Sequence, residues 1–99
     1  MSDIDYVYLG SAPGDEDCAQ LGEDDYEEKS RGECQRYIEL ILKVFEQHHG
    51  REPLCRVRRK SQSHDFGTYY EVVASFDYTI KGQVDDAYWI EENAPTNWE

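Results

Sequence analysis

The sequence predicts an α+β domain in which a small antiparallel sheet of about three strands is covered by one long helix and a short C-terminal helix. The chain has 99 residues, which fits one domain spanning 1–99, because so short a chain rarely builds two cores. Apolar positions recur every three or four residues between Cys34 and His48, which indicates a helix. Alternating side chains over Thr68–Tyr78 indicate a strand.

The first third of the chain is predicted to hold a short strand and an acidic segment. Residues 4–9 are rich in β-branched and aromatic types, which favour a strand, and the turn residues of 10–14 end it. Residues 15–28 carry eight acidic side chains and no basic one. We interpret 10–30 as a mobile acidic loop, or as a loop that leads into the first turns of a helix.

The long helix is predicted over Asp24–His49. Acidic residues near its start suit the positive end of the helix dipole, and Gly50 is a natural residue to follow its last turn. Gly32 weakens the first turns by about 1 kcal/mol relative to alanine, so a start after Gly32 is the alternative. The apolar stripe of this helix comprises Cys34, Tyr37, Ile38, Ile41, Val44, Phe45 and His48.

A β-hairpin is predicted to follow the helix, because Pro53 prevents its continuation. Leu54–Lys60 has the alternating character of a strand, Ser61–Gly67 is predicted to turn, and Thr68–Tyr78 is the second strand. Paired in this way, the basic first strand would lie beside acidic side chains of the second. One face of the second strand is predicted to carry Tyr70, Val72, Ala74, Phe76 and Tyr78, and the other Tyr69, Glu71, Val73, Ser75 and Asp77.

The short helix is predicted over Gly82–Glu92, where Val84, Ala87 and Tyr88 fall on one side. Asn93, Ala94 and Pro95 would end it. We expect 95–99 to be a tail.

Charge and cysteine content exclude several classes of function. The formal net charge of −12 opposes direct binding to nucleic acid or to an anionic membrane. The sequence contains no apolar stretch long enough to span a membrane and no leader with an apolar core at its start. Cys18, Cys34 and Cys55 form neither an even set nor a CxxC motif, so we expect free thiols in the cytoplasm.

Candidate catalytic residues are few, and none forms a recognised motif. The pair His64 and Asp65 has metal-ligand chemistry, but turn chemistry explains it more simply. Cys55 with His64 as its base is a formal nucleophile pair, yet a cysteine in a strand is more often a small core residue. Residues 10–14 lack the lysine of a phosphate-binding loop. We therefore predict a protein that is not an enzyme and has no cofactor and no metal.

The distribution of charge carries the functional prediction. Residues 51–60 have a net charge of +4, between an acidic 1–33 (net −9) and an acidic 71–99 (net −6), so we expect internal neutralisation of the basic island. Carboxylates three or four residues apart on a helix lie about 5–6 Å from each other and can imitate a phosphate backbone. The predicted partner-binding residues are Asp15, Glu16, Asp17, Glu23, Asp24, Asp25, Glu27 and Glu28, with Asp85, Asp86, Glu91 and Glu92 as a second patch.

Three stretches carry a resemblance to a known group: residues 8–20, the tract from His64 to Val72 (HDFGTYYEV), and residues 92–98 (ENAPTNW). They resemble small uncharacterised bacterial proteins of plasmids, phages and other mobile elements, and this resemblance implies no catalytic residues. In size and acidity the chain is also similar to phage anti-defence proteins, including anti-CRISPR proteins.

The leading hypothesis is thus a non-enzymatic acidic inhibitor or regulator. It would bind the basic surface of a nucleic-acid-handling host protein as a nucleic-acid mimic. The alternative is a structural or interaction module of unknown partner, including a homodimer through the tyrosine-rich strand or Trp98. A third hypothesis is a small hydrolase that uses Cys55 or the His64–Asp65 pair.

Overall fold

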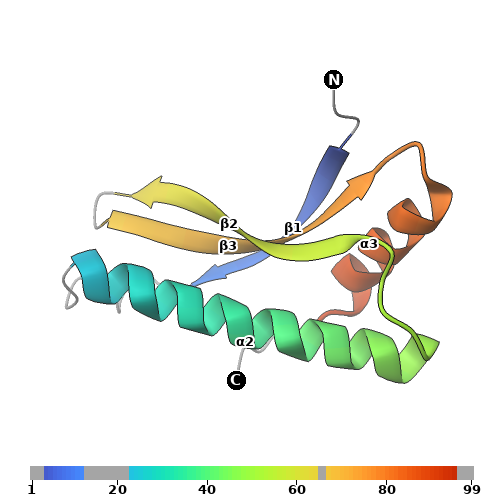
Figure 1. Cartoon of the computed structure of the whole chain (residues 1–99), viewed down its shortest axis with the longest axis horizontal. Helices are drawn as coiled ribbons and strands as arrows, with labels where there is room; N and C mark the ends of the chain where they lie inside the picture. Colours follow the sequence, from blue (N-terminus) through green and yellow to red (C-terminus); the bar gives the residue numbers. More distant parts are fainter. Residues whose placement is uncertain (1–3, 13–22, 65–66, 96–99) are drawn as a thin grey trace.

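The computed structural model describes residues 4–12, 23–64 and 67–95, and it confirms the predicted α+β class (Figure 1). Each predicted strand and helix is present, although several begin or end elsewhere. In chain order the elements are β1 (Ile4–Ala12), α2 (Glu23–His49), β2 (Arg56–His64), β3 (Gly67–Asp77) and α3 (Lys81–Asn93).

The three strands form one antiparallel sheet in the order β1-β3-β2. β2 and β3 form the predicted hairpin, in which Val57 lies opposite Ala74 and Lys60 opposite Glu71. β1 pairs with the other side of β3, where Val7 lies opposite Ala74. The last strand along the chain is therefore the central one, and β1 and β2 are the two edges.

The core lies between one face of the sheet and the two helices. Figure 1 shows α2 running along the sheet, with α3 near the end where β3 finishes. The predicted stripe of α2 supplies Tyr37, Ile41 and Phe45, which are almost completely buried. They meet Val7 of β1, the apolar face of β3, and α3. The described part of the core comprises Val7, Cys34, Tyr37, Ile38, Ile41, Phe45, Cys55, Val72, Ala74, Phe76, Ala87 and Ile90.

The first turns of α2 support the second of the two interpretations of 10–30, a segment that leads into a helix, although β1 takes up 10–12. Residues 10–12 belong to β1 and 23–30 to α2, while 13–22 lie outside the described residues. Contacts with β3 explain the early helix start, because Ser30 is fully buried and its Oγ accepts a hydrogen bond from the Tyr70 backbone N–H at 2.7 Å. Tyr26, one turn earlier, is also buried. Packing therefore outweighs the roughly 1 kcal/mol cost of Gly32.

The hairpin differs from its prediction in length. Most of the expected turn at Ser61–Gly67 is strand, because β2 continues to His64 and β3 begins at Gly67, while residues 65–66 lie outside the description. Gly67 has a φ of 124°, so it supplies the special backbone angle expected of it. β3 ends at Asp77, and Tyr78 lies exposed in a turn rather than on the apolar face.

The ends of the helices follow the predicted signals. Gly50 has a φ of 69° and its N–H bonds the Glu46 carbonyl, as expected for a glycine after the last turn of α2. α3 begins at Lys81, one residue before its predicted start, and ends at Asn93 before Pro95. The Tyr37 hydroxyl donates to the Pro95 carbonyl at 2.7 Å, which ties this end of the chain to α2. Neither described helix has the length and apolar character needed to cross a membrane.

Candidate functional site

The first set of predicted partner-binding acids, Asp15 to Glu28, falls partly inside and partly outside the described residues. Asp15, Glu16 and Asp17 lie outside the described residues. The remaining members occupy the first two turns of α2, and there the structure exposes Asp25 and Glu28. These two are three residues apart and so lie on one side of the helix. The members on α2 are Glu23, Asp24, Asp25, Glu27 and Glu28.

Glu27 has a structural role that the sequence did not reveal. Its Oε1 accepts hydrogen bonds from the Tyr70 hydroxyl at 3.0 Å and from Arg31 at 3.2 Å. Arg31 also lies over the Tyr70 ring, 5.7 Å from its centroid. Glu27 therefore holds the first turns of α2 on the beginning of β3, and its carboxylate already has hydrogen-bond partners.

The second acidic patch lacks one of its predicted members, because Asp86 is buried at 4% exposure. Its carboxylate forms a two-point ion pair with Arg51, at 2.9 Å and 3.1 Å, and accepts the Leu54 N–H at 2.8 Å. Burial alone would raise the pKa of Asp86, but these hydrogen bonds and the charges of Arg51 and His49 together lower it. Asp86 thus fastens the segment after α2 to α3 and is not available to a partner.

The rest of this patch is exposed on α3. Asp85 is paired with Lys81 at 3.4 Å, whereas Glu91 and Glu92 are exposed near the end of the helix. Figure 1 shows the first turns of α2 at the opposite end of the molecule from α3. The two predicted patches are therefore separate surfaces, and the fold does not bring them together.

The basic residues of β2 correct the expectation of internal neutralisation. Within the described ranges, none of Arg56, Arg58, Arg59 and Lys60 is within ion-pair distance of a carboxylate. Arg58 donates to the Ser75 hydroxyl at 2.8 Å. Lys60 lies opposite Glu71 but donates instead to the Tyr6 hydroxyl at 2.9 Å.

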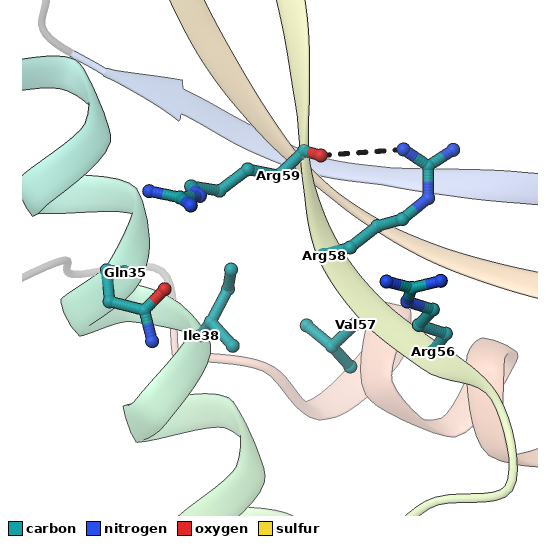
Figure 2. Close-up of a pocket in the computed structure, with 6 residues that line it drawn as sticks. All are labelled: Gln35, Ile38, Arg56, Val57, Arg58 and Arg59. Carbon is teal, nitrogen blue, oxygen red and sulfur yellow. Dashed lines mark hydrogen bonds between the residues drawn. The ribbon is translucent and has the colours of Figure 1, made fainter.

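Two hollows border β2. The first, about 530 Å³, lies between β2 and α2 and is lined by Gln35, Ile38, Arg56, Val57, Arg58 and Arg59. Figure 2 shows Arg59 directed toward Gln35 on α2, while Arg56 and Arg58 project to the other side of the strand. The second, about 280 Å³, is lined by Leu54, Arg56, Arg58, Ser75, Phe76, Asp77 and Gln83. Arg56 and Arg58 border both hollows.

The candidate nucleophile Cys55 is buried at 5% exposure. Burial and the nearby Asp86 carboxylate raise the pKa of its thiol to about 11, whereas a cysteine nucleophile needs a lowered pKa. Cys55 therefore acts as a core residue. Asp65 lies outside the described residues, and His64 is the last residue of β2. Among the described residues, no group of three or more histidine, cysteine or acidic side chains is arranged to hold a metal ion.

The edge position of β2 is the feature that sequence reasoning missed. The consecutive apolar residues Val72, Val73 and Ala74 were the available signal, because a strand buried on both faces loses its alternation. That pattern would have placed β3 in the centre and its hairpin partner at an edge.

Comparison with known proteins adds no assignment: no family model, curated protein or solved structure matches the chain. Within the described residues, the charged surfaces of the chain are the two exposed acidic surfaces on α2 and α3 and the basic edge strand β2.

Proposed function

We propose that the protein is a non-enzymatic acidic inhibitor or regulator that binds a basic nucleic-acid-handling protein. The observation that supports it is the acidic surface formed by Asp25 and Glu28 on the first turns of α2. Both side chains are exposed, and within the described ranges neither is in an ion pair. The anti-CRISPR reading is one form of this proposal, with a CRISPR effector as the basic partner.

Rigidity of this surface favours the proposal. Tyr26 and Ser30 are buried on the sheet side of the same turns, so the helix that carries the exposed carboxylates is held in place. The Cβ atoms of helical residues three apart lie about 5–6 Å from each other, which lets their carboxylates take up a spacing comparable to that of neighbouring phosphates on one strand. A preformed row of negative charge loses little entropy when it enters a groove shaped for a nucleic-acid backbone.

The net charge of −12 supports fast association with such a groove. Complementary fields raise association rates at low salt, and the effect declines as the Debye length shortens. Glu91 and Glu92 form a separate acidic surface on α3 that contributes to the same field. Complex formation should therefore weaken steeply as salt rises.

The test begins with capture of partners from a nuclease-treated bacterial lysate, eluted in steps of salt. A captured basic protein is then purified, and its binding to labelled duplex DNA is measured by fluorescence anisotropy with increasing amounts of this protein. The proposal predicts displacement of the DNA. It fails if the captured protein binds DNA equally well in its presence.

A charge-matched pair of variants localises the effect. The first replaces the exposed acids of the two surfaces (Asp25→Asn, Glu28→Gln, Glu91→Gln and Glu92→Gln). The second makes the same charge change at exposed acids elsewhere (Asp5→Asn, Glu39→Gln, Glu46→Gln and Glu52→Gln). We expect displacement to be lost in the first variant and largely kept in the second. Equal losses would show that net charge alone is responsible.

A self-associating interaction module is the second candidate. Tyr6 and Tyr8 are 42% and 51% exposed on β1, the other edge of the sheet, which supports pairing of two copies there. Sedimentation velocity over a hundredfold concentration range tests this reading. A constant monomer mass would rule it out.

A further inference from the structure

We propose that the outer edge of β2 binds an extended acidic segment of a partner protein as a fourth strand of the sheet. Three independent observations meet on this strand. It is an edge strand, its cations have no carboxylate partner within the described ranges, and two hollows border it.

The backbone of β2 has one edge that can pair with an added strand. In the described sheet β2 is hydrogen-bonded to β3 alone. The opposite side of an edge strand presents a row of N–H and C=O groups, and an extended peptide can pair with that row. Nine residues, Arg56–His64, are available as a template.

The side chains of β2 specify the charge of the ligand. Residues directly opposite each other in paired strands point to the same face, so an added strand would place alternate side chains beside Arg56 and Arg58. The repeat along a strand is about 6.6–6.8 Å for every second residue. Acidic residues at alternate positions would therefore meet successive cations.

The arginines do not converge on a single point. In Figure 2 the guanidinium groups of Arg59 and Arg58 lie on opposite sides of the strand, and Arg56 projects separately. A single compact anion could not reach all three. An extended chain that follows the strand can place acidic residues beside Arg56 and Arg58 on one face, while its other face meets Val57 and Arg59 on the side of α2.

The two hollows indicate which other side chains the peptide ligand should carry. On the side of α2, Val57 and Ile38 offer an apolar contact next to Arg59 and Gln35. On the other side, Leu54 borders the second hollow together with the two arginines. The inferred ligand alternates acidic residues with small or medium apolar residues, and the apolar set enters the hollow beside α2.

Nucleic acid fits this edge less well than a peptide. The net charge of −12 repels a polyanion as a whole, whereas a short peptide meets only the local charges within a Debye length of about 8 Å. A nucleic acid also cannot pair with the strand backbone. A second copy is disfavoured, because full antiparallel pairing of β2 with itself would place Lys60 opposite Lys60, and a register centred on Arg58 would place Arg56 opposite Lys60 and Arg58 opposite Arg58.

The experiment uses fluorescence anisotropy at physiological salt with a labelled eight-residue probe in which glutamate and valine alternate. Three matched probes accompany it: four glutamates followed by four valines, the alternating sequence with N-methylated backbone, and an eight-nucleotide thymidine strand. We expect saturable binding of the alternating probe alone. Equal binding of the block peptide or the N-methylated peptide overturns strand addition, and tighter binding of the oligonucleotide overturns the choice of ligand.

Variants of the protein locate the site. Exposed ion pairs each change affinity by about twofold to fivefold, so loss of the pairs made by Arg56 and Arg58 in the triple variant Arg56→Gln, Arg58→Gln and Arg59→Gln should weaken binding about fourfold to twenty-fivefold. The control (Arg36→Gln, Lys43→Gln and Lys81→Gln) removes the same charge at exposed positions elsewhere and should keep binding. If the triple variant does not fold, Arg56→Gln alone is compared with Arg36→Gln.

Self-association must be measured in the same variants. If the β2 variant forms dimers or larger species while the unmodified protein binds no probe, the arginines only protect an open edge and the proposal is wrong. The proposal is also separable from the acidic surface, since Asp25→Asn with Glu28→Gln should abolish neither probe binding nor its sequence preference. Loss of probe binding in that variant would contradict the assignment to β2.

Discussion

Replacing Asp86 with alanine should destabilise the protein by about 2–3 kcal/mol. The change removes three hydrogen bonds, two from Arg51 and one from the Leu54 N–H. Hydrogen bonds to charged groups contribute about 1.5–3 kcal/mol each, and breaking a buried pair costs about 3–5 kcal/mol. We expect a cost below the full value for a buried pair, because the Arg51 side chain is 45% exposed and can turn to water once Asp86 is removed. The Asp86 side chain itself is only 6% exposed.

The assay is urea unfolding followed by circular dichroism, with the free energy compared only where the slopes agree. Asp85→Ala is the matched control, because Asp85 is adjacent but exposed, and its partner Lys81 is 92% exposed. We expect a change below about 0.5 kcal/mol for the control. Asp86→Asn keeps an oxygen for the Leu54 N–H and should fall between the two. If Asp86→Ala matched Asp85→Ala, the argument for a structural anchor would be refuted.

The same pair predicts a pH dependence. The pKa of Asp86 is lower in the folded protein than in the unfolded chain, so its charge stabilises the fold above the unfolded value of about 3.9. That stabilisation is lost as pH falls through the folded pKa. The stability difference between the unmodified protein and Asp86→Asn should therefore be constant near neutral pH and decline below about pH 4. An undiminished difference at pH 2 would contradict the ion pair as its source.

Three further changes test the account of the fold. Gly32→Ala should stabilise the protein by about 0.5–1 kcal/mol, since nothing lies within 4 Å of the added carbon. Gly50→Ala should destabilise it by about 1–2 kcal/mol, because Gly50 has a φ of +69°. Equal shifts of the two variants in thermal unfolding would contradict both expectations. The Cys55 thiol should resist iodoacetamide at pH 7 until urea unfolds the chain, and rapid labelling mapped by mass spectrometry would show that it is accessible. Ser30→Ala should cost about 1–3 kcal/mol because the Tyr70 N–H loses its acceptor; a cost below 0.5 kcal/mol in calorimetry would mean that this bond does not hold the first turns of α2.

The type and order of the elements could be predicted because local signals agree with the final packing. Of the stripe predicted along α2, Cys34, Tyr37, Ile38, Ile41 and Phe45 are buried, whereas Val44 is half-buried and His48 is exposed. Gly50 occupies the position after the last turn of α2. The early start of α2 could not be predicted, because its support comes from Tyr70 on β3, forty residues after Ser30. The low helix propensity of Gly32 favours a later start, and the tertiary contact with Tyr70 stabilises the helix before it.

The candidate sites were less predictable for the same reason. Asp85 and Asp86 are adjacent and chemically alike, but only Asp86 meets Arg51, which lies 35 residues earlier. The basic residues of β2 were visible in sequence, yet their lack of carboxylate partners among the described residues depends on strand order. The burial of a particular side chain such as Asp86 depends on the assembled fold, whereas the apolar run Val72, Val73 and Ala74 was a signal within one segment for a central β3 and an edge β2.

The strand order also has a consequence for folding during synthesis. β1 is made first but has its partner on β3, so at least the 54 residues between Ala12 and Gly67 must be added before the two can pair. At about 5–20 residues per second this interval lasts roughly 3–10 seconds. The β2–β3 hairpin needs no such delay, because its strands are neighbours in the chain. Throughout that interval the apolar and aromatic residues of β1 are open to other binding partners, including chaperones.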